Sequence, residues 1–168
     1  MMGRRDVWRA AMGLGLAAAL GACGGDVGPP QNDLVGVWAM EDPQIAVDGA
    51  QAVQLSDVRV TYRGDGTSDY AARLQAPGED GTPIALLLDG DVRWTLEETV
   101  LTRTLEQMQV SAAEPSAAND QIAALYAQGL NSQPPARFIV EALDDAQLVL
   151  LDPETGDTLR FTRTGEGR

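Results

Sequence analysis

The chain has 168 residues, a hydrophobic content of 44% and a formal net charge of −13, values typical of one globular, strongly acidic domain. This acidity excludes nucleic acid and anionic lipid headgroups as natural partners, because proteins bind them largely through Lys and Arg. Histidine is absent, every basic residue is arginine and there is one cysteine, which excludes Ser-His-Asp and Cys-His nucleophiles, Schiff-base lysines and the usual zinc sites.

The N-terminus has the layout of an export signal. Arg4, Arg5 and Arg9 form a positive segment, and residues 10–20 form a short apolar one that ends in small residues. About 13 residues separate Arg9 from Cys23, fewer than the roughly 20 that a membrane-spanning helix needs. We therefore expect residues 1–22 to be a signal peptide.

The segment Leu20-Gly21-Ala22-Cys23 resembles the lipobox of bacterial lipoproteins. The resemblance implies cleavage before Cys23 and acylation of this residue with chains such as palmitate, which would anchor the protein in a membrane. Gly24 follows the cysteine and Asp26 comes later, so the resemblance favours the outer membrane, with the protein facing the periplasm. The alternatives are an ordinary secretory signal with a chance cysteine, or an uncleaved segment.

A tether and one domain follow the predicted anchor. Residues 23–33 are rich in Gly, Pro and amides, which predicts a flexible spacer. The domain is expected over 34–165, with a charge near −15 once residues 1–22 are removed. We interpret the charge as a solvated surface, with a cationic partner as the alternative.

Alternation of apolar and polar residues predicts strands through the first half of the domain. The first is expected at 34–40, and a hairpin joins 58–62 to 70–74 through the turn Gly64-Asp65-Gly66. Further strands are expected at 84–88 and 92–96. A turn at Glu97-Glu98 then leads to a strand over 99–110.

One helix interrupts the strands. Ser116 or Asn119 can cap it, Gly129 is expected to end it, and Pro134-Pro135 prevents its continuation. Strands are then expected at 138–142, 148–151 and 159–163, with turns between them. The fold class predicted is all-β: a small antiparallel up-and-down barrel of eight or nine strands, with one short inserted helix near 116–129 at its mouth or side.

The segment Leu34-Val35-Gly36-Val37-Trp38 resembles the Gly-x-Trp signature of lipocalins and of lipocalin-like domains in bacterial lipoproteins. The resemblance implies that Gly36 lets the chain cross the closed end of the barrel. It also implies that Trp38 packs beneath an arginine of the last strand, either Arg163 or Arg160. The inserted helix departs from the usual lipocalin order, in which the helix follows the eighth strand.

A small apolar or amphipathic ligand is the occupant expected for such a barrel. The candidate lining residues are Tyr62, Tyr70, Leu74, Trp94, Ile122, Leu125 and Tyr126. For Trp94, Tyr62, Tyr70 and Leu74 a packed-core position is the alternative. If the interior is solid, the alternative function is a structural lipoprotein that contacts another envelope protein.

Acidic side chains concentrate in the predicted turns, where carboxylates solubilise the chain and cap the backbone. Glu97, Glu98, Asp144, Asp145, Asp152, Glu154 and Asp157 all lie in turns. The oxygen-rich turns at 65–69 and 152–157 do not match the calcium loop pattern, so we assign no metal and no cofactor. We expect binding rather than catalysis; an enzyme built on paired carboxylates is the remaining hypothesis.

Overall fold

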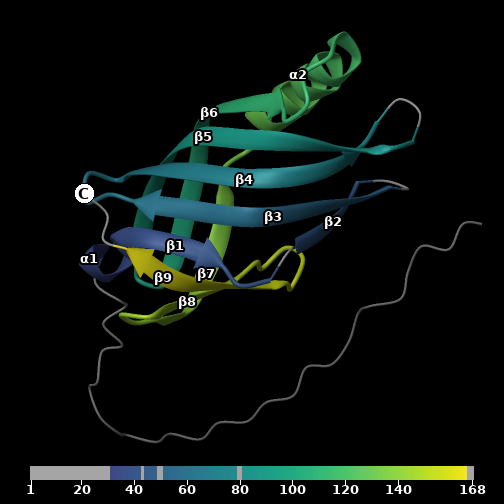
Figure 1. The fold of residues 1–168 in the computed structure, drawn as a ribbon. Helices are drawn as coiled ribbons and strands as arrows, with labels where there is room; N and C mark the ends of the chain where they lie inside the picture. Colours follow the sequence, from purple (N-terminus) through teal and green to yellow (C-terminus); the bar gives the residue numbers. More distant parts are fainter. Residues whose placement is uncertain (1–30, 43, 49–50, 79–80, 166–168) are drawn as a thin grey trace, which may run out of the picture.

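The computed structural model describes residues 31–42, 44–48, 51–78 and 81–165, which contain two helices and nine strands (Figure 1). The helices are α1 (Gln31–Leu34) and α2 (Ala117–Asn131). The first strands are β1 (Gly36–Met40), β2 (Gln44–Asp48), β3 (Gln51–Tyr62), β4 (Thr67–Pro77) and β5 (Pro83–Glu97). The later strands are β6 (Val100–Ala112), β7 (Ala136–Leu143), β8 (Gln147–Leu151) and β9 (Thr158–Gly165). The predicted Cys23 anchor and signal peptide lie outside the described residues.

The strands form one antiparallel sheet that closes on itself. Their order is β1-β9-β8-β7-β6-β5-β4-β3-β2, and an additional pairing joins β1 to β3. Gly36 faces Tyr62 across this closing pair, whereas β2 pairs with the other end of β3, with Gln44 facing Leu55. Eight strands of the described chain thus complete the barrel, and β2 extends it at one end. The predicted up-and-down barrel class is confirmed.

The core follows from period-two alternation, which β5 shows most clearly. Along this strand Leu86, Leu88, Val92, Trp94 and Leu96 are all buried, and the residues between Leu86 and Leu96 at odd positions are exposed. Successive side chains of a strand point to opposite faces, so one face of β5 contributes to the barrel interior over its whole length.

Two bulges shift which residues face inward. In β6 the register shifts opposite Asp91 and Val92, which pair with Gln107 and Leu105, so that Glu106 is the extra residue. Before it, odd positions such as Leu101 face inward; after it, even positions such as Met108 do. β3 has a similar irregularity at Asp57, whose φ is +53°. After a bulge of this kind, the inward-facing residues of the strand change from odd-numbered to even-numbered positions, or the reverse.

Four features differ from the sequence expectations. The predicted strands at 84–88 and 92–96 are one strand, because Gly90 continues the ladder between Tyr70 and Met108 instead of turning the chain. The strand β2 was not predicted. Residues 31–33, assigned to the tether, are helical with Leu34, whose side chain is buried in the core and so fixes the segment. The fourth difference concerns α2.

The helix α2 is confirmed near 116–129, but it ends later than predicted. Ser116 caps its start, since its Oγ accepts a hydrogen bond from Asn119 N at 3.1 Å. Gly129 lies inside the helix, and at the helix end the Ser132 main-chain N–H donates to Gly129 O at 3.2 Å and the Gln133 N–H donates to Leu130 O at 3.1 Å. No helix among the described residues is long and apolar enough to cross a membrane.

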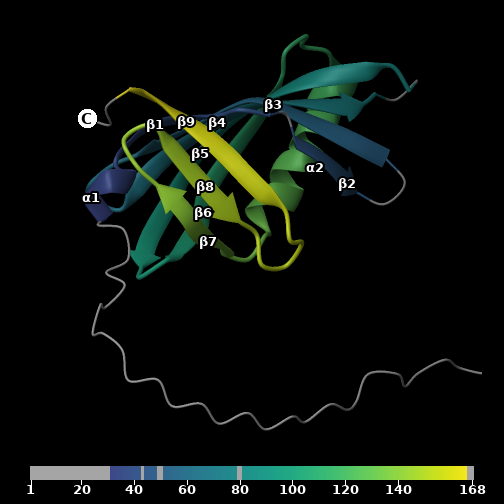
Figure 2. The same cartoon turned by 90° about the horizontal axis from the view of Figure 1, so that it is seen from below.

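The two helices lie toward opposite ends of the barrel (Figures 1 and 2). α1 lies at the end where β1 begins and β9 finishes, and α2 lies toward the other end against β6. Figure 1 shows α2 beside the end of β6 and away from α1, β1 and β9. The barrel therefore has one end adjoining its first segment and a second end adjoining the inserted helix.

Candidate functional site

The end beside α1 is filled by an arginine stacked on a tryptophan. Trp38 is fully buried, and its Nε1 donates to Leu34 O at 2.8 Å. The guanidinium carbon of Arg163 lies 4.2 Å from the centre of the Trp38 ring system, a cation–π contact. Arg160, the other predicted candidate, is exposed. Of the two, Arg163 is therefore the arginine that stacks on Trp38.

The same arginine joins the last strand to the first segment of the domain. Arg163 Nη1 donates to Val35 O at 2.6 Å, and Nη2 donates to Asp33 O. A Cβ added at Gly36 would lie 2.3 Å from Arg163 Nη1, and the φ of this residue is +154°. Gly36 is thus needed both for its backbone conformation and for the approach of the guanidinium.

Tyr62 and Trp94 form the next part of the core. Their rings meet edge to face, with centroids 5.6 Å apart and an interplanar angle of 87°. Trp94 Nε1 donates to Thr67 O at 2.9 Å. The Tyr62 hydroxyl is buried with no hydrogen-bond partner, and burial raises its pKa, while Arg103 lowers it to a smaller extent. Tyr62 and Trp94 are therefore packed in the core, which was the alternative to a cavity-lining position, and neither lines the cavity described below.

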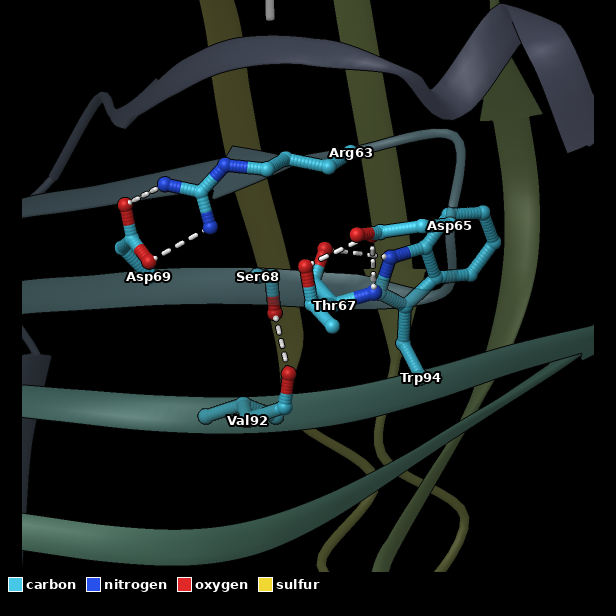
Figure 3. Close-up of polar contacts among 7 residues, drawn as sticks. All are labelled: Arg63, Asp65, Thr67, Ser68, Asp69, Val92 and Trp94. Carbon is cyan, nitrogen blue, oxygen red and sulfur yellow. Dashed lines mark hydrogen bonds and ion pairs between the residues drawn. The ribbon is translucent and has the colours of Figure 1, made fainter. Parts of the chain in front are cut away.

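The turn between β3 and β4 uses its polar groups internally (Figure 3). Arg63 forms a bidentate ion pair with Asp69, and Asp65 Oδ1 accepts hydrogen bonds from Thr67 N at 2.9 Å and Thr67 Oγ1 at 2.6 Å. These bonds from Thr67 lower the pKa of Asp65. The carboxylates considered above for calcium are therefore engaged in the turn, and no group of three or more potential metal ligands occurs in the described part of the chain.

The later acidic turns have the same organisation. Asp144 Oδ1 accepts from the main-chain N–H groups of Ala146 and Gln147 at 2.7 and 2.8 Å, and these bonds lower the pKa of Asp144. Asp152 Oδ1 accepts from Glu154 N at 2.8 Å. Asp144 is exposed and Asp152 is partly exposed. Their arrangement is that of side-chain-capped turns.

An apolar cavity of about 640 Å³ lies toward the other end of the barrel, beneath α2. Its walls come from β3 to β7, from α2 and from the segment after α2. The lining residues are Leu55, Tyr70, Leu74, Leu88, Val92, Arg103, Leu105, Met108, Leu125, Tyr126, Gly129, Leu130, Gln133, Ala136 and Phe138. Its volume lies in the range of pockets for small organic ligands.

Four of the predicted lining residues contribute to this cavity. Tyr70 and Leu74 line it from β4, and Leu125 and Tyr126 line it from α2. Ile122 does not line it; this side chain packs against the core beside the buried Ala123. Leu125 is 63% exposed, so the helix contributes an edge of the cavity that is open to solvent.

The sequence prediction missed Arg103, a charged residue of this cavity. Its guanidinium carbon lies 5.5 Å from the Tyr70 ring centre and 5.9 Å from that of Phe138. Its Nε is buried without a hydrogen-bond partner. Burial raises the pKa of Tyr70, and the charge of Arg103 lowers it by less. The alternation of Leu101, Arg103 and Leu105 in the sequence was the available signal, since it places Arg103 on the inward face.

The helix α2 is attached to the barrel beside this cavity through Asn131. Its Oδ1 accepts a hydrogen bond from Met108 N at 2.7 Å, and its Nδ2 donates to Met108 O at 2.9 Å. These two bonds occupy the main chain of Met108, which lines the cavity. One side chain thus replaces a neighbouring strand along this part of β6.

Comparison with known proteins shows a likeness to solved structures but to no protein family. The chain matches no protein-family model, and no curated protein matches it. A solved structure to which it is similar is a lipocalin-like protein from Bacteroides uniformis, with 20% sequence identity and a TM-score of 0.39. The alignment covers 79% of this chain and 98% of that one. The fold class of this chain is defined by its own strand order and closure.

Proposed function

We propose that this protein is a lipid-anchored envelope protein whose barrel binds a small apolar or amphipathic molecule without chemically changing it. The observation that carries the proposal is the 640 Å³ cavity, whose lining residues are mostly apolar. Transfer of apolar ligand surface from water contributes about 25 cal/mol per Å². A ligand would therefore gain free energy by entering this space.

The cavity also distinguishes the proposal from its main alternative, a barrel with a solid core that serves only as a scaffold. In that case the interior would be filled by side chains throughout, at the density of a normal protein core. Here the packed core is formed around Trp38, Tyr62 and Trp94, whereas the space bordered by Leu74 and Met108 is unfilled by protein. This division favours a binding barrel.

The membrane anchor is proposed from the sequence. The lipobox-like segment ending at Cys23 supports acylation, and Gly24 in the following position supports an outer-membrane location facing the periplasm. Replacement of Cys23 with Ser should release the protein from membranes and abolish incorporation of labelled palmitate, because the acylated sulfur is lost. A Cys23→Ser protein that stayed acylated and membrane-bound would contradict the anchor.

Ligand binding can be tested in the full-length Cys23→Ser chain, purified into detergent-free buffer. Titration with a neutral apolar fluorescent probe should give saturable binding. Leu105→Trp, in the cavity wall, should weaken that binding by filling the space, whereas Leu87→Trp on the outer face of β5 should not.

Native mass spectrometry of the gently extracted wild-type protein supplies a second readout, since a retained ligand adds a discrete mass. Absence of probe binding and of any retained mass would overturn the proposed binding function. Equal effects of Leu105→Trp and Leu87→Trp would show that the probe binds elsewhere.

A further inference from the structure

We infer that the cavity selects an anionic single-chain amphiphile, such as a long-chain carboxylate, and that Arg103 contacts its charged group. This inference rests on the proposed binding function. It assigns to the ligand a class of headgroup that an apolar cavity alone would not specify. The argument depends on the position, partners and surroundings of Arg103.

Arg103 faces the barrel interior because of the register of β6. It lies before the bulge at Glu106, in the part of the strand where Leu101 and Leu105 also face inward. Beyond the bulge the parity reverses, and the odd position 107 is exposed. The strand geometry therefore holds a permanently charged guanidinium against the apolar cavity.

The charge of Arg103 has no acidic partner among the described residues. Arg63 and Arg93 each form an ion pair, with Asp69 and Glu106 respectively, but no such pair occurs for Arg103. Its Nε is buried and makes no hydrogen bond. A partly buried cation without a counter-charge is costly, so a bound anion would recover free energy that the protein alone does not.

Aromatic contacts hold the guanidinium without satisfying its donors. The Tyr70 and Phe138 rings lie 5.5 and 5.9 Å from the guanidinium carbon, within the range of cation–π contacts. Such contacts stabilise the positive charge, but the two rings supply no carbonyl or carboxylate oxygen that could accept a hydrogen bond from the guanidinium N–H groups. The planar guanidinium of Arg103 therefore retains donors suited to two carboxylate oxygens.

The surroundings determine the sign of the preferred ligand. Among the described residues that line the cavity, Arg103 alone carries a formal charge at neutral pH, although the whole chain has a net charge of −13. A cationic amphiphile would meet like charge inside the cavity, and a neutral one would leave Arg103 unpaired. A carboxylate with one apolar chain complements both the charge and the apolar walls.

The test compares two probes with the same chain, dodecanoate and 1-dodecanol, in the full-length Cys23→Ser protein at pH 7.4. Displacement of the neutral fluorescent probe gives both affinities. We expect dodecanoate to bind at least about tenfold more tightly than the alcohol, as a charged hydrogen bond contributes that much. Arg103→Met should remove this preference while leaving alcohol binding intact, and Arg103→Lys should retain part of it.

Arg73→Met is the matched control, because it removes one positive charge from the exposed side of β4. It should leave the preference for dodecanoate unchanged. If neither probe binds the Cys23→Ser protein, the proposed function fails; if both bind equally, only the anion inference fails. A preference that survives in Arg103→Met also overturns it. If Arg103→Met does not fold, Arg103→Gln takes its place. The comparison of dodecanoate with 1-dodecanol in the Cys23→Ser protein, with Arg103 present, tests the anion inference in either case.

Discussion

Replacement of Arg163 with Met should substantially destabilise the barrel, because this residue joins the last strand to the first segment of the domain. The substitution keeps an unbranched apolar side chain over Trp38 but removes the guanidinium. The cation–π contact at 4.2 Å contributes about 0.5–2 kcal/mol. The bond from Nη1 to Val35 O, part-buried and 2.6 Å long, contributes about 1.5–3 kcal/mol because its donor is charged.

The bond to the exposed Asp33 O adds less, because water can replace it. We therefore expect Arg163→Met to lower the free energy of unfolding by about 2–4 kcal/mol. Urea unfolding of the full-length Cys23→Ser chain, followed by tryptophan fluorescence, measures this change. Arg160→Met is the control on the same strand and should change stability by less than about 0.5 kcal/mol. Equal stability of the two variants would refute the structural role assigned to Arg163.

Three further substitutions test other contacts of the barrel. Gly36→Ala should cost about 1–3 kcal/mol in urea unfolding, because its Cβ would displace the Arg163 guanidinium; an unchanged midpoint would contradict this. Tyr62→Phe should keep or raise stability at pH 7, since it removes a buried hydroxyl without a partner. Because burial raises the pKa of Tyr62 above its unfolded value near 10, the hydroxyl ionises more easily in the unfolded chain, so the stability of the parent falls, relative to its value at pH 7, as pH rises above about 10. The parent should therefore lose more stability than Tyr62→Phe between pH 9 and 11, and parallel losses would count against this assignment. Asn131→Ala should accelerate hydrogen exchange in α2 and release of the probe, because both bonds to the Met108 main chain are lost. Gln128→Ala, on the exposed helix surface, should change neither rate. Equal hydrogen exchange in the two variants would argue against the attachment of α2 through Asn131.

Most strands could be predicted from the sequence because the barrel interior is apolar and each strand presents alternate residues to it. The alternating apolar residues Val58, Val60 and Tyr62, and those along β5, are the ones that are buried in the barrel. The break expected near Gly90 was wrong because a glycine in a strand can also make room for a neighbour. A Cβ there would lie 2.7 Å from Met108 Cε.

Less of the candidate site could be predicted, because it depends on how distant strands meet. Sequence alternation cannot decide between core and cavity for Tyr62 and Tyr70, since both point inward and differ in their height along the barrel. Arg103 was missed because hydrophobic patterning alone treats a charged residue as exposed. The five residues of β2 are too few for alternation to be distinctive.

The pairing of β1 with β9 also sets an order of events during biosynthesis. Val35 and Arg163 are 128 residues apart, so at about 5–20 residues per second roughly 6–25 s separate their synthesis. Throughout that interval β1 lacks the neighbour that completes one of its edges, and Trp38 lacks the arginine that covers it. The barrel can therefore close only after strand β9 has been made, and until then the β1 edge and Trp38 stay without their partners from β9.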